Sequence, residues 1–399
     1  MESGSREVRK EYENIEWLGL TAKIAAFRAS SCVVNVISYY KHDKAYKRTR
    51  YLPIGLALFG DGVESFAGSG IIIECEQCSD ATYSTIILTH ANLFMRRGCA
   101  PIPPNEIEVD VALSDGKLCK CEFVACDFYY NLAAVRIITD IPLQPANMRS
   151  LDDSLFIHPT QPLPLDRSSQ LCPHYDLFKI VPDDKVIALS RTKDNPDDRH
   201  FFEITVGHFS MKRPSINCNE LFGVKGIDGD KYNGGPVINY SGEVIGIMFH
   251  ESSFLPSNII SRWWKHYKTY REFRRPRIGF RVVNLYTAEA GFLEQLIRKF
   301  PSFSTGVLVL KVEEDSPAYC SGICDFDVII QINGVVVQGT LEFFEKTWDK
   351  VGESVELIVL RESTGDQLNI STTIGEATPE KFPEWVSTYT EWLNMKKME

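Results

Sequence analysis

The sequence predicts a mainly β protein, in which a large domain of short strands precedes a helical linker and a smaller second domain. Short apolar or β-branched runs, separated by turn residues, recur at intervals of about 8–12 residues through the first part of the chain, a spacing typical of a barrel or sandwich. After an amphipathic helical stretch, the composition changes at residue 276 and a second set of short strands begins.

Length and charge limit the classes of function. The 399 residues suffice for two or three domains with full hydrophobic cores. The net charge of -10 disfavours non-specific nucleic-acid binding, which depends on neutralising phosphates. No apolar run approaches the roughly 18 residues that span a bilayer, and the acidic N-terminal stretch fits neither a signal nor a transit peptide. With eleven irregularly spaced cysteines, these features predict a cytoplasmic or nuclear protein with reduced thiols and no membrane association.

The first domain is expected at residues 29–258, after a polar N-terminal extension over residues 1–28. Its strands are expected at residues 31–38, 66–73, 85–89, 106–111, 117–124, 132–137, 186–189, 203–210, 237–239 and 244–247. A proline-rich stretch between residues 140 and 180 is expected to connect two halves of the domain.

A linker helix is expected at residues 259–275. Its apolar face, spaced at i, i+3, i+4 and i+7, consists of Ile260, Trp263, Trp264 and Tyr267. Its outer side carries Arg262, Lys265, Lys268 and Arg271. These cations leave two interpretations, a nucleic-acid stripe or a solvated helix, and the acidic chain and aromatic face favour the second. The second domain is expected at residues 276–375 and a C-terminal helix at 376–399, where Trp385, Tyr389, Trp392 and Leu393 have helical spacing.

Two close pairs of cysteines, Cys75 with Cys78 and Cys119 with Cys121, have the residue types of a zinc site. The second pair lacks the two-residue spacer usual for thiolate sites, and its members would also share one face of a strand. The sequence leaves metal binding by these four thiols open, and it predicts no cofactor.

A sharp bend is predicted at Asn233-Gly234-Gly235-Pro236, because consecutive glycines followed by a proline mark backbone that only residues without a Cβ can form. Such a bend can hold the residue before it rigidly at the lip of a sheet. Asn233 occupies that position.

Several segments follow one another in a telling order: Gly68-Ser69-Gly70-Ile71-Ile72, Leu88-Thr89-His90-Ala91-Asn92, Asn131-Leu132-Ala133-Ala134-Val135, Thr205-Val206-Gly207-His208-Phe209-Ser210, Gly242-Glu243-Val244-Ile245-Gly246-Ile247, Ile278-Gly279-Phe280, Ser316-Pro317-Ala318 and Asp327-Val328-Ile329. Together, over about residues 30 to 375, they resemble the HtrA/Deg (protease Do-like) family, including its plant members. The resemblance implies a chymotrypsin-like double β-barrel, then a helical linker and a PDZ domain.

The chain departs from this family at the positions that carry its chemistry. The histidine, aspartate and serine positions of the catalytic triad correspond to Asn92, Asn131 and Asn233. Acyl transfer needs a hydroxyl nucleophile, an imidazole base and a carboxylate that orients it, and a carboxamide serves none of these roles. Lys231 stands where the oxyanion loop begins with glycine, and Tyr232 follows it. The resemblance therefore predicts non-functional triad positions and an inactive protease domain.

The alternative is a serine-type endopeptidase with a non-standard or relocated catalytic group. His90 lies two residues before the expected histidine, and a helical turn would rotate its side chain by roughly 200° away from the site. Cys99, Cys126 and Cys218 are candidate thiol nucleophiles, but no motif aims them, and buried reduced thiols are expected.

The function predicted from the resemblance is binding. A PDZ domain adds an extended C-terminal peptide to a sheet and holds its carboxylate on backbone N–H groups of a turn, here Arg277, Ile278, Gly279 and Phe280. The alternative is that this loop only begins a strand in a domain that docks within the chain. The barrel cleft is expected to hold peptides or unfolded segments. The family also implies a homo-oligomer, a trimer by analogy.

Overall fold

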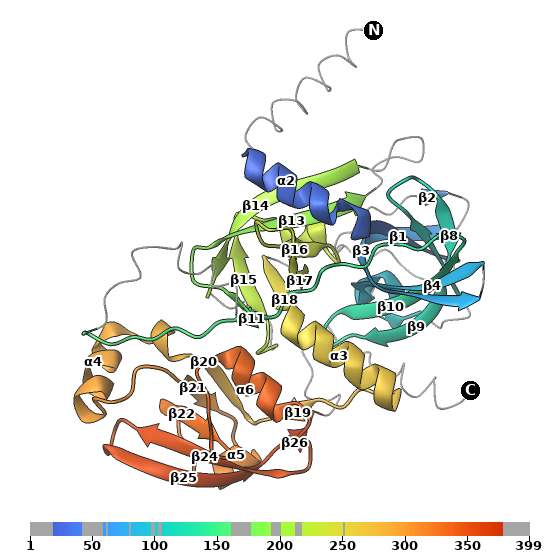
Figure 1. Ribbon diagram of the computed structural model, residues 1–399. Helices are drawn as coiled ribbons and strands as arrows, with labels where there is room; N and C mark the ends of the chain where they lie inside the picture. Colours follow the sequence, from blue (N-terminus) through green and yellow to red (C-terminus); the bar gives the residue numbers. More distant parts are fainter. Residues whose placement is uncertain are drawn as a thin grey trace.

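The computed structural model describes residues 19–41, 59–60, 63–79, 81–96, 100–102, 106–160, 177–192, 201–211, 218–249 and 252–377. Most elements are strands, arranged as two barrel-like sheets and a separate third sheet (Figure 1). This confirms the predicted mainly β fold. The predicted C-terminal helix lies outside the described residues, apart from its first two. In the part of the chain that is described, no helix is both long and apolar enough to cross a membrane.

The first barrel is an antiparallel sheet with the strand order β8-β7-β1-β3-β4-β10-β9. These strands are β1 (Val33–Lys41), β3 (Val63–Ser79), β4 (Thr82–His90), β7 (Ile107–Ala112), β8 (Leu118–Lys120), β9 (Glu122–Asp127) and β10 (Leu132–Thr139). β2 (Phe59–Gly60) pairs with β3, and β5 (Met95–Arg96) pairs with β6 (Ala100–Pro101). Buried β-branched and leucine side chains, among them Val34, Ile71 and Leu88, fill the interior.

The second barrel is closed, in the order β13-β14-β15-β18-β17-β16. Its strands are β13 (Lys185–Thr192), β14 (Phe201–Ser210), β15 (Phe222–Lys225), β16 (Pro236–Ile238), β17 (Val244–Met248) and β18 (Ser253–Pro256). The connection between the barrels carries β11 (Leu151–Asp152), which pairs with β12 (Phe178–Lys179) in parallel. Phe209, Phe222 and Phe254 pack edge to face or tilted in the core of this barrel.

Helix α2 (Leu20–Ala29) precedes the first strand and lies across β13 and β14 (Figure 1). Its buried face consists of Ala22, Ala25, Ala26 and Ala29. The domain boundary predicted at residue 28 therefore falls inside a packed helix. Hydrophobic periodicity did not indicate this helix, because small alanines form its buried face while Leu20 and Phe27 point outward and are 74% and 66% exposed.

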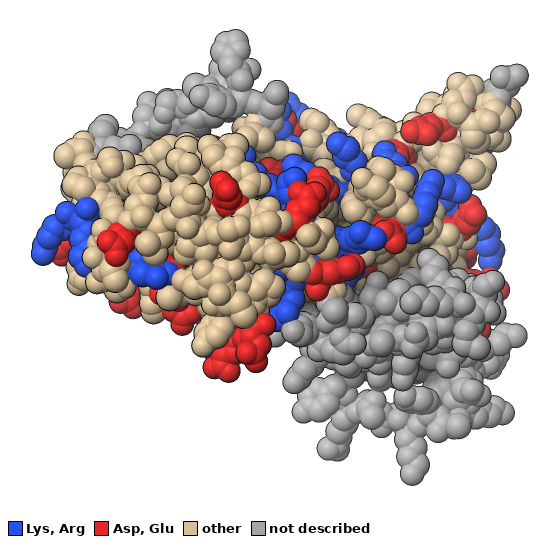
Figure 2. Space-filling model, turned by 90° about the horizontal axis from the view of Figure 1, so that it is seen from below, with Lys and Arg blue, Asp and Glu red and all other residues tan. Residues whose placement is uncertain are grey.

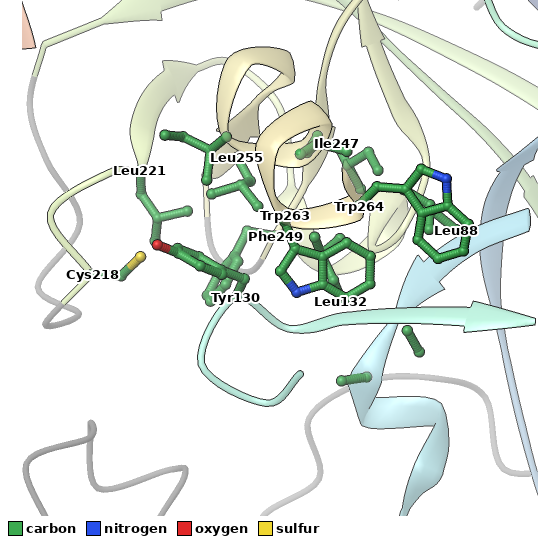
Figure 3. Close-up of a cluster of buried hydrophobic side chains, with 14 of the residues drawn as sticks. Leu88, Tyr130, Leu132, Cys218, Leu221, Ile247, Phe249, Leu255, Trp263 and Trp264 are labelled. Carbon is green, nitrogen blue, oxygen red and sulfur yellow. The ribbon is translucent and has the colours of Figure 1, made fainter. Parts of the chain in front are cut away.

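Helix α3 (Ser257–Tyr270) joins the barrels to the third sheet, and its buried face is the predicted one. Trp263 donates its indole N–H to Asp127 Oδ2 at 2.9 Å, and Tyr267 donates to the carbonyl of Val124 at 2.6 Å. Figure 3 shows Trp263 beside Tyr130 and Leu132 of the first barrel. Aromatic burial against the barrel thus fixes the orientation of the helix.

The basic side of α3 faces acidic side chains. Arg262 lies 3.4 Å from Asp349, and Lys268 pairs with Glu74. On the face shown in Figure 2, Lys and Arg side chains are interspersed with Asp and Glu and form no continuous patch of one sign. This arrangement favours the solvated-helix interpretation over a nucleic-acid stripe.

The third sheet has the order β20-β21-β22-β24-β25. Its strands are β20 (Phe280–Asn284), β21 (Val307–Val312), β22 (Asp327–Ile332), β24 (Ser354–Arg361) and β25 (Asp366–Thr373), with β23 (Val335–Val336) on β22 and β19 (Pro276–Arg277) paired with β26 (Gly375–Glu376). The helices are α4 (Ala290–Lys299), α5 (Pro317–Cys320) and α6 (Thr340–Thr347).

Helix α6 attaches this third sheet to the barrels. Leu341 is buried in the core of the second barrel, and Trp348 stacks on Tyr130 with ring centroids 5.7 Å apart. Asp153, in the segment that follows β11, is 1% exposed. Its carboxylate accepts hydrogen bonds from Thr340 Oγ1 (2.6 Å), Asn284 Nδ2 (2.7 Å) and the N–H of Leu341 (3.2 Å). A side chain of the large domain therefore caps the N-terminus of a helix in the small one.

Candidate functional site

The structure brings two of the three triad-equivalent residues into direct contact. Asn92 lies in the 3-10 turn η2 (Ala91–Phe94), and its N–H donates to Asn131 Oδ1 at 3.1 Å. Asn131 Nδ2 donates to the carbonyl of Phe249 at 3.2 Å. The backbone of Asn131 has φ +48, a left-handed conformation that asparagine tolerates better than most residues. Asn131 therefore bridges η2 to the chain that follows β17, and both ends of its amide are used.

Asn233 follows the 3-10 turn η4 (Gly229–Tyr232) and is 5% exposed. Its Oδ1 is buried and has no hydrogen-bond partner among the described residues. Its backbone carbonyl accepts from the N–H of Ser69 at 3.2 Å. The side chain predicted to be equivalent to the nucleophile is therefore enclosed, and its backbone is hydrogen-bonded to β3.

The bend after Asn233 is the one that the sequence predicts. Gly234 has φ +76, and a Cβ there would lie 2.3 Å from the carbonyl oxygen of Ser69. A Cβ on Gly235 would lie 2.1 Å from the carbonyl oxygen of Leu189. Their N–H groups donate to the carbonyls of Met248 (3.1 Å) and Tyr232 (2.9 Å). Close backbone packing, independent of any chemistry, requires glycine at both positions.

The oxyanion-loop equivalents are held by their side chains. Lys231 is exposed and forms an ion pair with Glu203 of β14 at 3.0 Å. Tyr232 is buried in the core of the second barrel, where its hydroxyl lies 2.5 Å from Thr205 Oγ1. Burial raises the pKa of Tyr232, which keeps the phenol neutral.

His90 is buried and ends β4 in an extended conformation, so the predicted rotation of its side chain by a helical turn is wrong. The imidazole instead packs against two glycines. A Cβ on Gly68 would lie 2.1 Å from His90 Nε2, and one on Gly234 would lie 3.1 Å from His90 Cδ2. The ring therefore occupies space beneath the bend that only glycines leave open, which suits a structural histidine.

Two of the candidate thiols are buried and unsuited to nucleophilic attack. Cys126 is 1% exposed, and Cys218 is 2% exposed. Burial raises the pKa of Cys218 well above its usual value, and its thiol donates to Glu220 Oε2 at 3.4 Å. A thiol of raised pKa is a poor nucleophile at neutral pH. Cys99 lies outside the described residues.

The four cysteines of the zinc hypothesis do not converge. Cys75 lies on β3, whereas Cys119 lies on β8, and β1 and β7 stand between these strands in the sheet. Burial raises the pKa of the Cys121 thiol to about 12, which opposes the thiolate that zinc requires. The described residues contain no group of three or more side chains able to hold a metal ion. This arrangement favours structural roles for Cys119, which lies on β8, and for Cys121, which lies between β8 and β9.

The loop at Arg277–Phe280 has a defined shape. Gly279 has φ +82, and a Cβ there would lie 2.5 Å from the Cβ of Ser316. The carbonyl of Gly279 accepts from the N–H of Glu313 (2.8 Å) and from Ser316 Oγ (3.2 Å). Because the peptide is trans, the N–H of Phe280 points away from these donors. The loop therefore has a backbone N–H directed away from its own sheet partners.

A cavity of about 340 Å³ adjoins this loop. Its apolar wall consists of Ile278, Phe280 and Phe344, the last from α6. Tyr129, Asn219 and Glu220 of the barrel domain also line it. Beside the cavity, β20 is the edge strand of its sheet and pairs only with β21 among the described residues. The small domain is docked within the chain, and the cavity lies where this loop meets the barrel domain.

Comparisons with known proteins agree with this architecture. The model of the PDZ domain family matches residues 276–372. Protease Do-like 14 of Arabidopsis thaliana is 25% identical over 289 residues, 68% of this chain and 58% of that protein. Serine protease HTRA3 of Mus musculus is 30% identical over 143 residues, 34% of this chain and 30% of that protein. The chain therefore spans less than two thirds of the length of these curated relatives.

The fold is shared with a solved structure, the HtrA-type protease AlgW with a tripeptide. The TM-score is 0.50 at 18% identity, over 90% of this chain and 98% of the other. Fold and matches together define a trypsin-like domain of two β-barrels followed by a PDZ domain. In sequence and in domain order, the chain is similar to the HtrA/Deg family of Do-like proteases.

Sequence reasoning missed Tyr129, Glu220 and Phe344, which line the cavity, and Asp153, which binds the start of α6. None of them belongs to a motif, and the proline-rich region that contains Asp153 was expected only to connect two halves. Their roles depend on the docking of the PDZ domain against the barrels, which no local pattern encodes.

Proposed function

We propose that this chain is a catalytically inactive HtrA/Deg-like protein that binds C-terminal peptides through its PDZ domain. The observation that carries the proposal is the cavity at the Gly279 loop, beside the free edge of β20. An extended peptide can add to such an edge as a strand and place its carboxylate on the backbone N–H groups of the loop. The apolar wall of Ile278, Phe280 and Phe344 suits an apolar last side chain.

Peptide binding is tested on the full chain, because the PDZ domain shares buried contacts with the barrels. Fluorescein-labelled peptides that end in an apolar residue with a free carboxylate are expected to bind, as measured by fluorescence polarisation. Gly279→Ala, at φ +82 and 2.5 Å from Ser316 Cβ, distorts the loop and is expected to weaken binding at least tenfold. Gly322→Ala is the matched control, because it also has positive φ but no atom within 4 Å of an added Cβ.

Two results would contradict the proposal. One is a library of free C-terminal peptides that gives no binder while circular dichroism shows a folded protein. The other is equal affinity for a peptide and its C-terminal amide, because an amide lacks the charge that the loop is proposed to hold.

The proposed inactivity rests on the three asparagines. A triple reversion, Asn92→His with Asn131→Asp and Asn233→Ser, is expected to leave casein uncleaved. The reason is that Asn131→Asp replaces the amide donor to the Phe249 carbonyl, 3.2 Å away, by a second acceptor, and position 233 is enclosed. The measurement is cleavage of labelled casein, together with labelling by a serine-directed active-site probe. Cleavage by the reverted protein would mean that the scaffold lacks only its catalytic groups.

Three further predictions concern the barrel cleft, the oligomeric state and the location of the protein in the cell. The barrel cleft is proposed to hold unfolded segments without cutting them. A homo-oligomer, a trimer by family resemblance, is tested by light scattering of the full chain. The cytoplasmic or nuclear location is tested by fluorescence microscopy of a tagged protein.

A further inference from the structure

The cavity beside the Gly279 loop carries positive charge that the protein itself does not neutralise. The charged side chains that line it are Arg277, Arg281, Lys311, Glu220 and Glu313. Arg277 pairs with Glu313, and Glu220 accepts hydrogen bonds from Tyr130 (3.2 Å) and Cys218 (3.4 Å). Within the described residues, Arg281 and Lys311 have no ion-pair partner. The lining therefore holds three cations and two acids, a net charge of +1, and neither acid forms an ion pair with Arg281 or Lys311.

These two cations lie side by side. Arg281 on β20 is directly opposite Lys311 on β21, so their side chains leave the same face of the sheet. Both are exposed. Like charges in directly opposite positions repel each other and destabilise the pair. An anionic group of a ligand at this face would relieve that repulsion, which makes the pair a place where a negative side chain binds favourably.

The register of an added strand determines which ligand residue meets this pair. A peptide that runs antiparallel to β20, with its carboxylate at the Gly279 loop, has its last residue beside Phe280. The residue before it then lies beside Arg281. Because side chains alternate between the faces of a strand, the last side chain points to the apolar wall and the penultimate one to the face of Arg281 and Lys311.

We propose that the PDZ domain selects C-terminal peptides whose penultimate residue is aspartate or glutamate. This inference rests on the proposed function of the Gly279 loop as a carboxylate site and names the ligand class of that site. The apolar wall determines the last residue, and the unpaired cations determine the one before it.

The test compares two peptides that differ only in a penultimate Glu or Gln and share a valine with a free carboxylate as last residue. Fluorescence polarisation with the full chain at low salt is expected to show about fivefold tighter binding of the Glu peptide, the size of one exposed ion pair. At about 1 M salt the preference is expected to vanish, because the Debye length falls to about 3 Å.

The double variant Arg281→Gln with Lys311→Gln is expected to bind both peptides as the wild type binds the Gln peptide. Arg298→Gln is the matched control, an exposed cation on α4, and it is expected to keep the preference. Equal affinity of the wild type for the two peptides overturns this inference and leaves the proposed function standing. Failure of both peptides and of every other free C-terminus overturns the proposed function, and this inference with it.

Discussion

Asp153→Ala is expected to lower the free energy of unfolding by roughly 3–5 kcal/mol, because it removes a buried carboxylate and leaves its hydrogen-bond donors without an acceptor. The variant would leave Asn284 Nδ2, Thr340 Oγ1 and the N–H of Leu341 without their acceptor at the joint between the domains. Urea unfolding, followed by circular dichroism and tryptophan fluorescence, measures the loss. Trp348, which stacks on Tyr130 across this joint, is one of the six tryptophans that contribute to the fluorescence signal.

The neighbouring acid supplies the control. Asp152 is only partly buried, and its carboxylate pairs with Lys179 at 3.0 Å, so Asp152→Ala is expected to cost about 1 kcal/mol or less. Equal losses in the two variants would show that the contacts of Asp153 contribute no more than a surface ion pair, and that other contacts hold the PDZ domain in place.

Ionisation of Asp153 gives this loss a pH dependence. Burial raises the pKa of the Asp153 carboxyl above its usual value, against the hydrogen bonds that lower it. The folded state therefore binds this proton more tightly than the unfolded state does. The resulting stabilisation is complete below the unfolded pKa of about 3.9 and is lost as pH rises through the higher folded value. The deficit of Asp153→Ala against wild type is thus expected to be largest at acidic pH.

Local sequence patterns predicted the elements that are formed by residues close together in the sequence. The 3.6-residue spacing of Ile260, Trp263, Trp264 and Tyr267 gave the buried face of α3, and two glycines with a proline gave the bend after Asn233. Residues whose surroundings come from distant segments were not predictable. Asp153 and Thr340 are 187 residues apart, and only domain docking brings them together.

In the candidate site, too, some residues were predicted from local motifs, whereas others depend on contacts between distant parts of the chain. The positions of Asn92, Asn131 and Asn233 followed from motifs that resemble a family, whereas the conformation of His90 did not. Whether His90 ends a strand or enters a turn depends on its pairing with Leu132 of β10, a long-range contact. The loop residues Ile278 and Gly279 were identified from the sequence, but the barrel residues Tyr129 and Glu220 beside them required the assembled chain.

Gly234→Ala is expected to destabilise the protein by roughly 2–5 kcal/mol, the sum of left-handed strain and overpacking. The residue has φ +76, and an added Cβ would lie 2.3 Å from the Ser69 carbonyl oxygen and 2.9 Å from the His90 nitrogen. Both are backbone atoms, so neither can move without shifting β3 or β4. The shift of the urea midpoint measures the loss.

Gly291→Ala is the matched control, because its Cβ would meet nothing within 4 Å and it lies near the start of α4. That variant is expected to gain up to about 1 kcal/mol from helix propensity. If Gly234→Ala proved neutral, the bend would be relaxed in solution and the glycine would need another explanation. The expected loss would instead mean that packing between the barrels is enough to require this glycine, even though the residue before it is an asparagine and offers no nucleophilic hydroxyl for the bend to position. The bend is therefore evidence for the fold, and the chemistry must be judged from the three carboxamides around it.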